Sequence, residues 1–169
     1  DAATKKGIWV TITPGATSPA VAEFTIGLIF SLLRNIHGLA SDTKNGRWQR
    51  FRGRELGSLT VGVVGAGSIG REVIKRAVSL GAQVVACDVE PERDFSAQWQ
   101  CEYTSLDDLL ARSDVVCLHV PMNDSTRALI SERKLRLMKE TAYLVDTSRP
   151  SVVDRSALLK ALEAGAIAG

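Results

Sequence analysis

From residue 59 onward, short apolar runs alternate with segments whose apolar residues recur at helical spacing. The runs are nearly continuous, which is typical of strands buried on both faces of a sheet. We expect strands at 59–64, 83–87, 115–120 and 142–145. We expect helices at 69–80, 131–138 and 154–163, and a short helix capped by Ser105. This alternation predicts an α/β fold of three layers, in which helices cover both faces of a Rossmann-type, doubly wound parallel sheet.

The residues before 59 follow another pattern. Residues 8–12 are apolar and predict a strand, and Ser18-Pro19 suits the start of a helix. A helix of about 18–25 residues should follow, and from Val21 it is apolar around most of its circumference. Such a helix must be buried on more than one side. In a small domain this predicts a subunit interface, so we expect a homodimer built on the helix that starts near Val21.

A polar, glycine-rich arm covers residues 40–58, where basic residues alternate with Trp48 and Phe51. Basic residues interleaved with aromatic ones also occur in nucleic-acid-binding segments. However, the formal net charge of the chain is only +2, and no nucleic-acid-binding motif accompanies the arm. We therefore expect a solvated arm, or a loop that docks on a second subunit, and no nucleic-acid partner.

Length and cysteine content narrow the class of protein further. The 169 residues predict one domain, with the helix and arm at 18–58 and the α/β core at 59–169. The odd cysteine count (Cys87, Cys101 and Cys117), without a CxxC pair, argues against disulfides and a metal site, so we expect reduced thiols and a cytoplasmic location. The longest apolar stretch is too short to cross a bilayer, and no signal peptide is visible, so we expect no membrane partner. Because the chain begins and ends on strand-like segments, it looks like a piece of a longer protein.

The turn Gly65-Ala66-Gly67-Ser68-Ile69-Gly70 is the first candidate binding site. A GxGxxG pattern alone is weak evidence, but here it follows a buried strand and opens a helix within a βαβ unit. Gly65 permits a tight turn, Gly67 lets a pyrophosphate approach the backbone, and Gly70 lets the helix pack close to the strand. The start of the helix offers N–H groups and a positive dipole end to the phosphates. The pattern predicts a dinucleotide site, and the alternative is a structural turn that binds nothing.

Asp88 follows the second strand of this unit, eighteen residues after Gly70. A carboxylate there accepts hydrogen bonds from the adenosine ribose hydroxyls and repels a 2′-phosphate, so we expect NAD rather than NADP. Arg93 lies nearby in the sequence and would soften that preference. Asp88 is otherwise an ordinary polar residue at a strand end. Methyltransferases also combine a glycine-rich turn with an acidic strand end, but the full six-residue spacing and the following motifs weigh against them.

The chain as a whole resembles the D-2-hydroxyacid dehydrogenase family, which includes phosphoglycerate, D-lactate and glyoxylate/hydroxypyruvate enzymes. The matching segments run in the family's order over nearly the whole chain: Val21-Ala22-Glu23, Val61 to Gly70, Ser105 to Leu110, Ser113 to Val116, His119-Val120-Pro121 with Thr126, Met138-Lys139, Val145 to Arg149, Val152-Val153-Asp154, Ala157-Leu158 and Ala161-Leu162. This match is far more specific than the glycines alone.

The resemblance implies roles for individual residues. Arg149 corresponds to the family's catalytic arginine, whose planar guanidinium suits a substrate carboxylate and the keto oxygen that gains negative charge. His119 belongs to a cofactor-lining segment and is not the acid/base histidine, which lies further on in the family. His37, in the apolar helix, is expected to be structural. The expected cofactor-binding residues are Gly65, Gly67, Ser68, Ile69, Gly70, Asp88, His119, Val120, Pro121, Thr126, Thr147, Ser148 and Arg149.

The chain departs from the family pattern at several points. The family's acid/base histidine, its partner glutamate and the aspartate of the next strand would all come after residue 169, and the first part of the substrate domain is also absent. This implies that the 169 residues alone are inactive. Asp146 stands where the family usually has asparagine, Pro150 where it has glycine, and Thr17 where some members have asparagine. Pro150 should push Arg149 into an extended conformation, which either presets or displaces it.

Three hypotheses of function follow. The first is an enzyme that transfers a hydride between NAD(H) and a D-2-hydroxy acid or 2-keto acid. The second is an NAD-regulated binding protein, because the C-terminal-binding-protein corepressors share this fold and use NAD to drive dimerisation and partner recruitment. The third, motivated by Pro150, is a catalytically inactive dinucleotide sensor. Turnover of keto acids by the full-length protein separates the first hypothesis from the other two.

Overall fold

The computed structural model describes residues 2–169. The helices are α1 (Ala2–Lys5), α2 (Ser18–Leu33), α3 (Ile36–Lys44), η1 (Leu56–Ser58), α4 (Ser68–Ser79), α5 (Arg93–Trp99), α6 (Leu106–Arg112), α7 (Glu132–Leu135), η2 (Pro150–Val152) and α8 (Arg155–Glu163). The strands are β1 (Thr60–Val64), β2 (Gln83–Cys87), β3 (Glu102–Tyr103), β4 (Val115–Leu118) and β5 (Tyr143–Asp146).

Within residues 2–169, five parallel strands form one sheet in the order β3-β2-β1-β4-β5. The chain leaves β1 to one side to form β2 and later returns to the other side to form β4. The order in which strands are added therefore reverses between β1 and β4, and at such a switch point ligands bind beyond the carboxyl ends of the strands. In register, Val61 lies opposite Val84 on one side and Val115 on the other.

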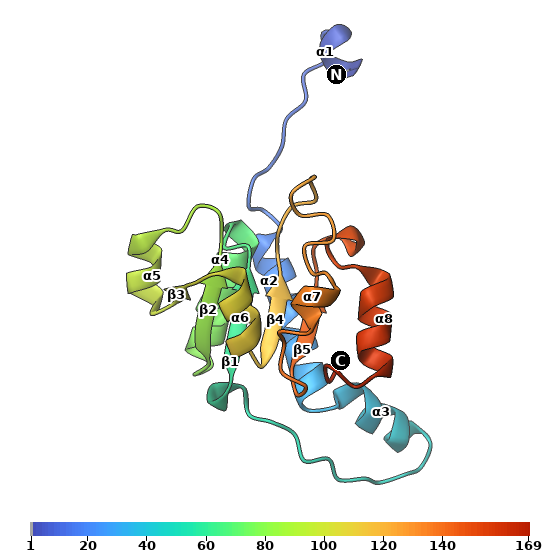
Figure 1. Ribbon diagram of the computed structural model, residues 1–169. Coiled ribbons are helices and arrows are strands. Elements are labelled where there is room, and N and C mark those ends of the chain that lie inside the picture. The colour runs from blue at the N-terminus through green and yellow to red at the C-terminus, as the bar shows by residue number, and fades with distance from the viewer. Residues whose placement is uncertain (1) are drawn as a thin grey trace.

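Helices cover both faces of the sheet, as the sequence predicted (Figure 1). Alternate strand residues point to opposite faces, so each strand contributes to two separate cores. Val61 and Val63 pack with α2, α4 and α5, whereas Val64 packs with α6, α7 and α8. Burial of each large aliphatic side chain contributes about 1.5–3 kcal/mol to folding, so both cores stabilise the sheet that positions the strand ends.

The structure corrects the expectations for the first 58 residues. Residues 8–12 are extended but form no strand, because the described residues offer them no partner strand. Figure 1 shows this segment carrying α1 away from the body of the domain. The expected single long helix is broken at Asn35, whose φ of 47° is left-handed, into α2 and α3 at a bend of 67°. Residues 40–44, assigned to the arm, are therefore helical.

The faces of α2 are also unequally buried. Ala22, Thr25, Ile29 and Leu33 face α4 and the sheet, whereas Phe24 is 62% exposed. Within this chain the helix is thus buried on one side only, and its expected second contact stays a prediction. His37, expected as a structural residue, is exposed on α3.

Smaller differences lie in the core. The structure adds α5 and the two-residue strand β3, where the sequence predicted a loop; it also ends β4 at Leu118 and shortens the helix expected at 131–138 to Glu132–Leu135. Cys101 and Cys117 are buried free thiols, and Cys87 is half-buried.

In residues 2–169 no single helix is long and apolar enough to span a membrane, although α2 and α3 together, as a bent pair, meet the length and composition required.

Candidate dinucleotide site

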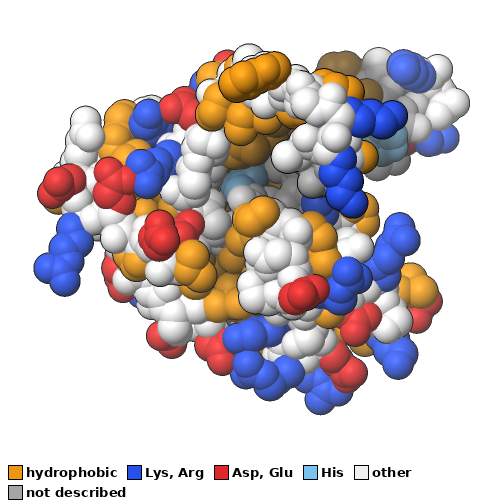
Figure 2. Space-filling model, turned by 90° about the horizontal axis from the view of Figure 1, so that it is seen from above, with side chains coloured by type: hydrophobic (Ala, Val, Ile, Leu, Met, Phe, Trp, Pro, Cys, Tyr) orange, Lys and Arg blue, Asp and Glu red, His pale blue; other side chains and the backbone are white. Residues whose placement is uncertain are grey.

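A groove of about 560 Å³ lies at the carboxyl ends of β1, β4 and β5. It is seen as a hollow in the surface when the molecule is viewed from above the strand ends (Figure 2). Three short segments line it, one after each strand: 67–69, 119–122 and 147–149. The groove therefore sits at the switch point of the sheet, where a parallel α/β fold binds its ligand.

Each glycine of the turn after β1 meets a different structural demand. Gly65 has a φ of +91°, and a side chain there would approach His119. Gly70 lies so close to Gly65 that a Cβ would overlap the Gly65 carbonyl oxygen. Gly67 has open space around its Cα and an ordinary φ of −71°. The fold therefore explains Gly65 and Gly70, whereas Gly67 leaves room for a ligand at the backbone.

The turn leads directly into α4, whose first residue is Ser68. The first N–H groups of a helix have no partner within the helix, and its dipole places a partial positive charge there. Arg71, one turn into α4, donates from Nε to the Ala66 carbonyl at 2.9 Å and forms an ion pair with Glu92. These contacts fix the turn in the shape that presents the helix start to the groove.

Asp88 follows β2 and is bonded to the same turn. Its Oδ2 accepts a hydrogen bond from the Ala66 N–H at 2.6 Å, and its Oδ1 accepts one from the Glu90 N–H at 2.9 Å. The Gly65 N–H also donates to the Cys87 carbonyl at 2.8 Å. The end of β2 and the glycine turn are therefore one connected unit. Asp88 itself is not among the residues that line the groove.

His119 and Thr147 form the opposite wall, after β4 and β5. Thr147 Oγ1 lies 3.3 Å from His119 Nδ1, and His119 Nε2 is buried with no hydrogen-bond partner in the described part of the chain. Burial lowers the pKa of His119 to about 4, although the nearby Asp146 carboxylate acts in the opposite direction. The imidazole is therefore neutral near pH 7 and does not act there as a proton donor with an ordinary histidine pKa.

Arg149 lies at one end of the groove, between two cavities. Its backbone is extended (φ −142°, ψ 135°), as the following proline requires, and its Nη1 donates to the Ser148 carbonyl at 2.8 Å. Ser148 in turn donates from its N–H and its hydroxyl to Asp146 Oδ1, at 2.8 and 2.6 Å. Asp146, which replaces the asparagine of the family pattern, therefore acts as an acceptor that shapes the turn before Arg149.

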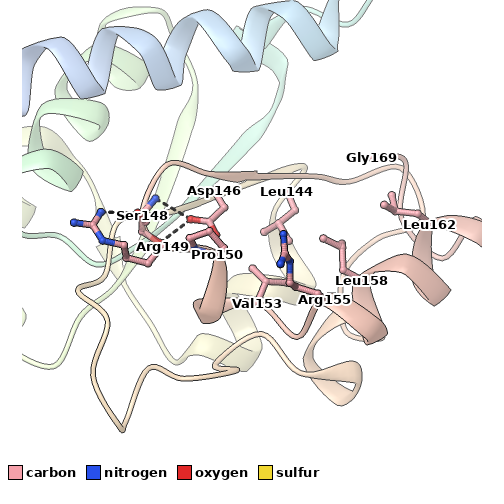
Figure 3. A pocket seen from close by; sticks show the side chains of 10 residues that line it. All are labelled: Leu144, Asp146, Ser148, Arg149, Pro150, Val153, Arg155, Leu158, Leu162 and Gly169. Carbon is pink, nitrogen blue, oxygen red and sulfur yellow. Dashed lines mark hydrogen bonds between the residues drawn. The ribbon is translucent and has the colours of Figure 1, made fainter.

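The second cavity, of about 350 Å³, lies between β5, η2 and α8 (Figure 3). Ser148 and Arg149 line both cavities, but Figure 3 shows the Arg149 guanidinium turned away from Leu144 and Leu158. The last residues of the chain run beside β5, where the Leu144 N–H donates to the Gly169 carbonyl at 2.9 Å. The Arg149 guanidinium thus lies on the groove side of the wall between the two cavities.

The groove gathers most of the residues that the sequence selected. Its lining includes Gly67, Ser68, Ile69, His119, Val120, Pro121, Thr147, Ser148 and Arg149. Gly65 and Gly70 do not line the groove, but they allow the turn to adopt its tight shape. Thr126 is not part of the lining; its hydroxyl donates to the Pro121 carbonyl at 2.6 Å and shapes the loop after β4. Sequence reasoning missed Met122, which lines the groove and directly follows the His119-Val120-Pro121 segment.

The residues present fit a dinucleotide. The open space at Gly67 admits a pyrophosphate, and the start of α4 attracts its charge. The buried Nε2 of His119 has no hydrogen-bond partner within residues 2–169 and is available to a ligand. Among residues 2–169, no group of three or more histidine, cysteine, aspartate or glutamate side chains is placed to hold a metal ion.

The sheet order, the glycine turn and the groove define a dinucleotide-binding domain of the Rossmann type. The family model described as D-isomer specific 2-hydroxyacid dehydrogenase, NAD binding domain, matches residues 26–169. The chain belongs to this family and is its NAD-binding domain.

Individual relatives agree with this assignment. A glyoxylate reductase of Thermofilum pendens is 44% identical over 174 residues, which is 99% of this chain and 51% of that protein. A hydroxypyruvate reductase of Thermotoga maritima is 38% identical, over 98% of this chain and 54% of the relative. The crystal structure of a D-lactate dehydrogenase from Aquifex aeolicus, complexed with NAD and lactic acid, matches with a TM-score of 0.90 and 39% identity, over 100% of this chain and 51% of that one. The chain thus spans about half the length of these relatives.

Proposed function

We propose that this domain binds NAD(H) in the groove and serves an oxidoreductase that interconverts a 2-keto acid and a D-2-hydroxy acid. The observation that carries the proposal is the groove itself, which joins the glycine turn, the His119 segment and Arg149 at the switch point of the sheet. The names of the three relatives, a glyoxylate reductase, a hydroxypyruvate reductase and a D-lactate dehydrogenase, support the same class of reaction.

Each segment of the groove has a task in this proposal. Ser68 and Ile69, at the start of α4, hold the pyrophosphate, and Asp88 holds the adenosine ribose. His119, Val120 and Pro121, with Thr147 and Ser148, surround the nicotinamide half. The bound nicotinamide supplies or accepts the hydride, and this chain binds and orients it.

We propose that NAD is preferred over NADP because of Asp88. Its carboxylate already accepts hydrogen bonds from Ala66 and Glu90, but two carboxylate oxygens offer about four acceptor positions, so capacity remains for ribose hydroxyls. A 2′-phosphate in the same place would face this negative charge. Arg93, at the start of α5, is exposed and would soften this preference.

Arg149 is the proposed catalytic residue of this chain. Its guanidinium would hold the substrate carboxylate and stabilise negative charge on the keto oxygen. The proton would come from a histidine outside these 169 residues, as the family resemblance implies. His119 does not suit that task, because burial holds its pKa near 4.

We also propose a homodimer in the cytoplasm. The outer side of α2 and the segment after it expose Phe24 (62%), Ile36 (51%), Trp48 (88%) and Phe51 (46%), which favours a second copy as the covering partner. The three free cysteines suit a reducing compartment. Light scattering of the full-length protein and of a Phe24→Asp variant tests the interface. Dimers that persist in the variant would place the interface elsewhere.

The activity is tested with the full-length protein, NADH and a panel of 2-keto acids that includes glyoxylate, hydroxypyruvate and pyruvate. We expect NADH oxidation with at least one of them, and a loss of at least about 100-fold in kcat/KM, or about 2.7 kcal/mol, in Arg149→Ala. Arg155→Ala is the matched control, since Arg155 lines only the second cavity and should leave turnover unchanged. NAD-dependent dimerisation without any turnover would instead favour a binding protein.

A further inference from the structure

A row of hydrogen bonds connects the interior of α2 with the groove. Thr25 is fully buried on α2, and its hydroxyl donates to the Val21 carbonyl at 2.9 Å. The same oxygen lies 3.2 Å from Thr147 Oγ1, and Thr147 Oγ1 lies 3.3 Å from His119 Nδ1. The row therefore begins at a backbone carbonyl, which can only accept, and ends at an imidazole that lines the groove.

The direction of every bond in this row follows from a count of protons. A threonine hydroxyl has one proton to donate and can accept elsewhere. The Thr25 proton is directed to Val21, so toward Thr147 it must accept, and Thr147 must donate. Thr147 then has no further proton, so it accepts from His119, whose Nδ1 must carry the hydrogen.

The state of the second ring nitrogen follows from the first. The pKa of His119 is lowered to about 4 by burial, with the Asp146 carboxylate opposing the shift, so the ring carries a single proton at neutral pH. With that proton on Nδ1, Nε2 presents a lone pair. Nε2 is buried and has no partner among the described residues. It is therefore an acceptor that favours a donor and disfavours phosphate oxygens.

We propose that Thr25 is a positioning residue for the groove: through Thr147 it fixes His119 in the Nδ1–H tautomer, so that Nε2 accepts a hydrogen bond from a hydroxyl or amide N–H of the bound dinucleotide. This inference rests on the proposed NAD(H) binding for its ligand, but the tautomer itself does not depend on any ligand. It also gives Thr25 a task beyond the back-bonding to the preceding turn that is common for threonine in helices.

The first test is the tautomer of His119 in this chain without ligand, measured by long-range ¹H–¹⁵N NMR of the imidazole nitrogens. A His37→Gln variant assigns the signals, since the chain has two histidines. We expect the wild-type His119 to carry its proton on Nδ1. In Thr25→Val the Thr147 hydroxyl is free to donate to Nδ1, so we expect a substantial Nε2–H population. Thr25→Ser, which keeps the hydroxyl, should restore the wild-type pattern.

Two results would overturn the proposed role of Thr25: a wild-type His119 with its proton on Nε2, or a Thr25→Val spectrum identical to the wild type. If Thr25→Val does not fold, Thr147→Val takes its place, because it removes the acceptor for Nδ1–H and should also weaken the tautomer preference. The wild-type spectrum tests the direction of the row without any variant.

The second test is titration of the same variants with NADH by calorimetry. We expect about tenfold weaker binding in Thr25→Val and binding within about twofold of wild type in Thr25→Ser. Equal affinities with an altered tautomer would contradict the role of Nε2 toward the dinucleotide. Absence of NADH binding in every form, wild type included, would count against the proposed function, whereas the NMR result would still decide whether Thr25 fixes the His119 tautomer.

Discussion

The Asp88 carboxylate accepts a hydrogen bond from the Ala66 N–H at 2.6 Å, across the gap between the end of β2 and the glycine turn. Two features that the sequence offered as separate signals are thus parts of one unit. Asp88 sets the position of the turn, and the turn in turn holds the carboxylate at the end of β2. In the proposed function, this connection would hold the adenosine half of the site in place and reduce the entropy lost on binding.

Substitution of Gly67 should weaken NADH binding, whereas substitution of Gly70 should mainly lower the stability of the fold. In Gly67→Ala the new methyl group meets open space in the protein but projects where a pyrophosphate would lie. We expect stability within about 0.5 kcal/mol of wild type and NADH binding at least about tenfold weaker. In Gly70→Ala the methyl group overlaps the Gly65 carbonyl, which should destabilise the fold by about 1–3 kcal/mol. Urea unfolding and calorimetry measure the two effects.

The control for this pair is Gly27→Ala on α2, where nothing lies within 4 Å of the added Cβ. It should stabilise the helix by up to about 1 kcal/mol and leave NADH binding unchanged. Equal losses of NADH affinity in Gly67→Ala and Gly27→Ala would show that the turn is not the phosphate site.

Asp114 should be a large contributor to stability at the opposite end of the sheet. Its carboxylate accepts from the Thr60 N–H at 3.0 Å and pairs with Arg54 at 2.7 Å and Lys139 at 3.3 Å. Burial alone would raise its pKa, but the Thr60 N–H and the two cations together hold it below the usual value. We expect Asp114→Asn to lower the free energy of unfolding by about 2–3 kcal/mol.

The Asp114 contribution has a defined pH dependence. A carboxyl group whose pKa is lowered by folding stabilises the protein fully above its ordinary pKa, near 4, and loses that effect as the pH falls through the folded value. The cost of Asp114→Asn in urea unfolding should therefore shrink below pH 4. Asp124→Asn, in the exposed loop after β4, is the control and should cost less than about 0.5 kcal/mol at any pH.

His119 should make the fold less stable in mild acid. Its folded pKa of about 4 lies below the ordinary value of 6.5, so between these two values the unfolded chain binds a proton that the folded chain does not. Stability should fall as the pH drops from about 6.5 to about 4, by an amount on the order of 3 kcal/mol at most. His119→Gln lacks this contribution. A stability difference between the two proteins that does not change from pH 7.5 to pH 5 would contradict the assignment.

Pro150 should preset Arg149 rather than displace it. Arg149 already has the extended backbone that the proline demands, and the Val152 N–H donates to the Arg149 carbonyl at 3.0 Å as η2 begins. Pro150→Gly should lower the free energy of unfolding by about 0.5–1 kcal/mol, since glycine leaves the unfolded chain more freedom. In the full-length protein it should reduce turnover several-fold. Increased turnover would show that the proline displaces the arginine, and unchanged turnover that it does neither.

Much of the fold could be predicted because its signals are local. The apolar run before Gly65 and the alternation that follows define β1, β2, β4 and β5, together with α4, α6, α7 and α8. The strand β3 could not be predicted, because two residues carry no periodic pattern and their strand conformation depends on pairing with β2. The apolar run at 8–12 suggested a strand, but a strand also needs a partner, which a local pattern cannot supply.

The candidate site also contains residues that the sequence could predict and one that it could not. Residues directly after strand ends, such as Ser68 and Arg149, could be selected because parallel strands end at one edge of the sheet. The proposed contribution of Thr25 could not, because its contact with Thr147 joins positions 122 residues apart and depends on how α2 packs. Nothing in the sequence around Thr25 distinguishes it from an ordinary helix residue.

The most direct test of the account is calorimetric titration of this chain with NADH and, separately, with NADPH, for the wild type and for Asp88→Asn. The asparagine keeps an oxygen that can accept from the Ala66 N–H but removes the negative charge. We predict that the wild type binds NADH at least about tenfold more tightly than NADPH, and that Asp88→Asn narrows this gap. Equal affinities for the two cofactors in the wild type, or an unchanged gap in Asp88→Asn, would contradict the assignment of Asp88 and the cofactor preference derived from it.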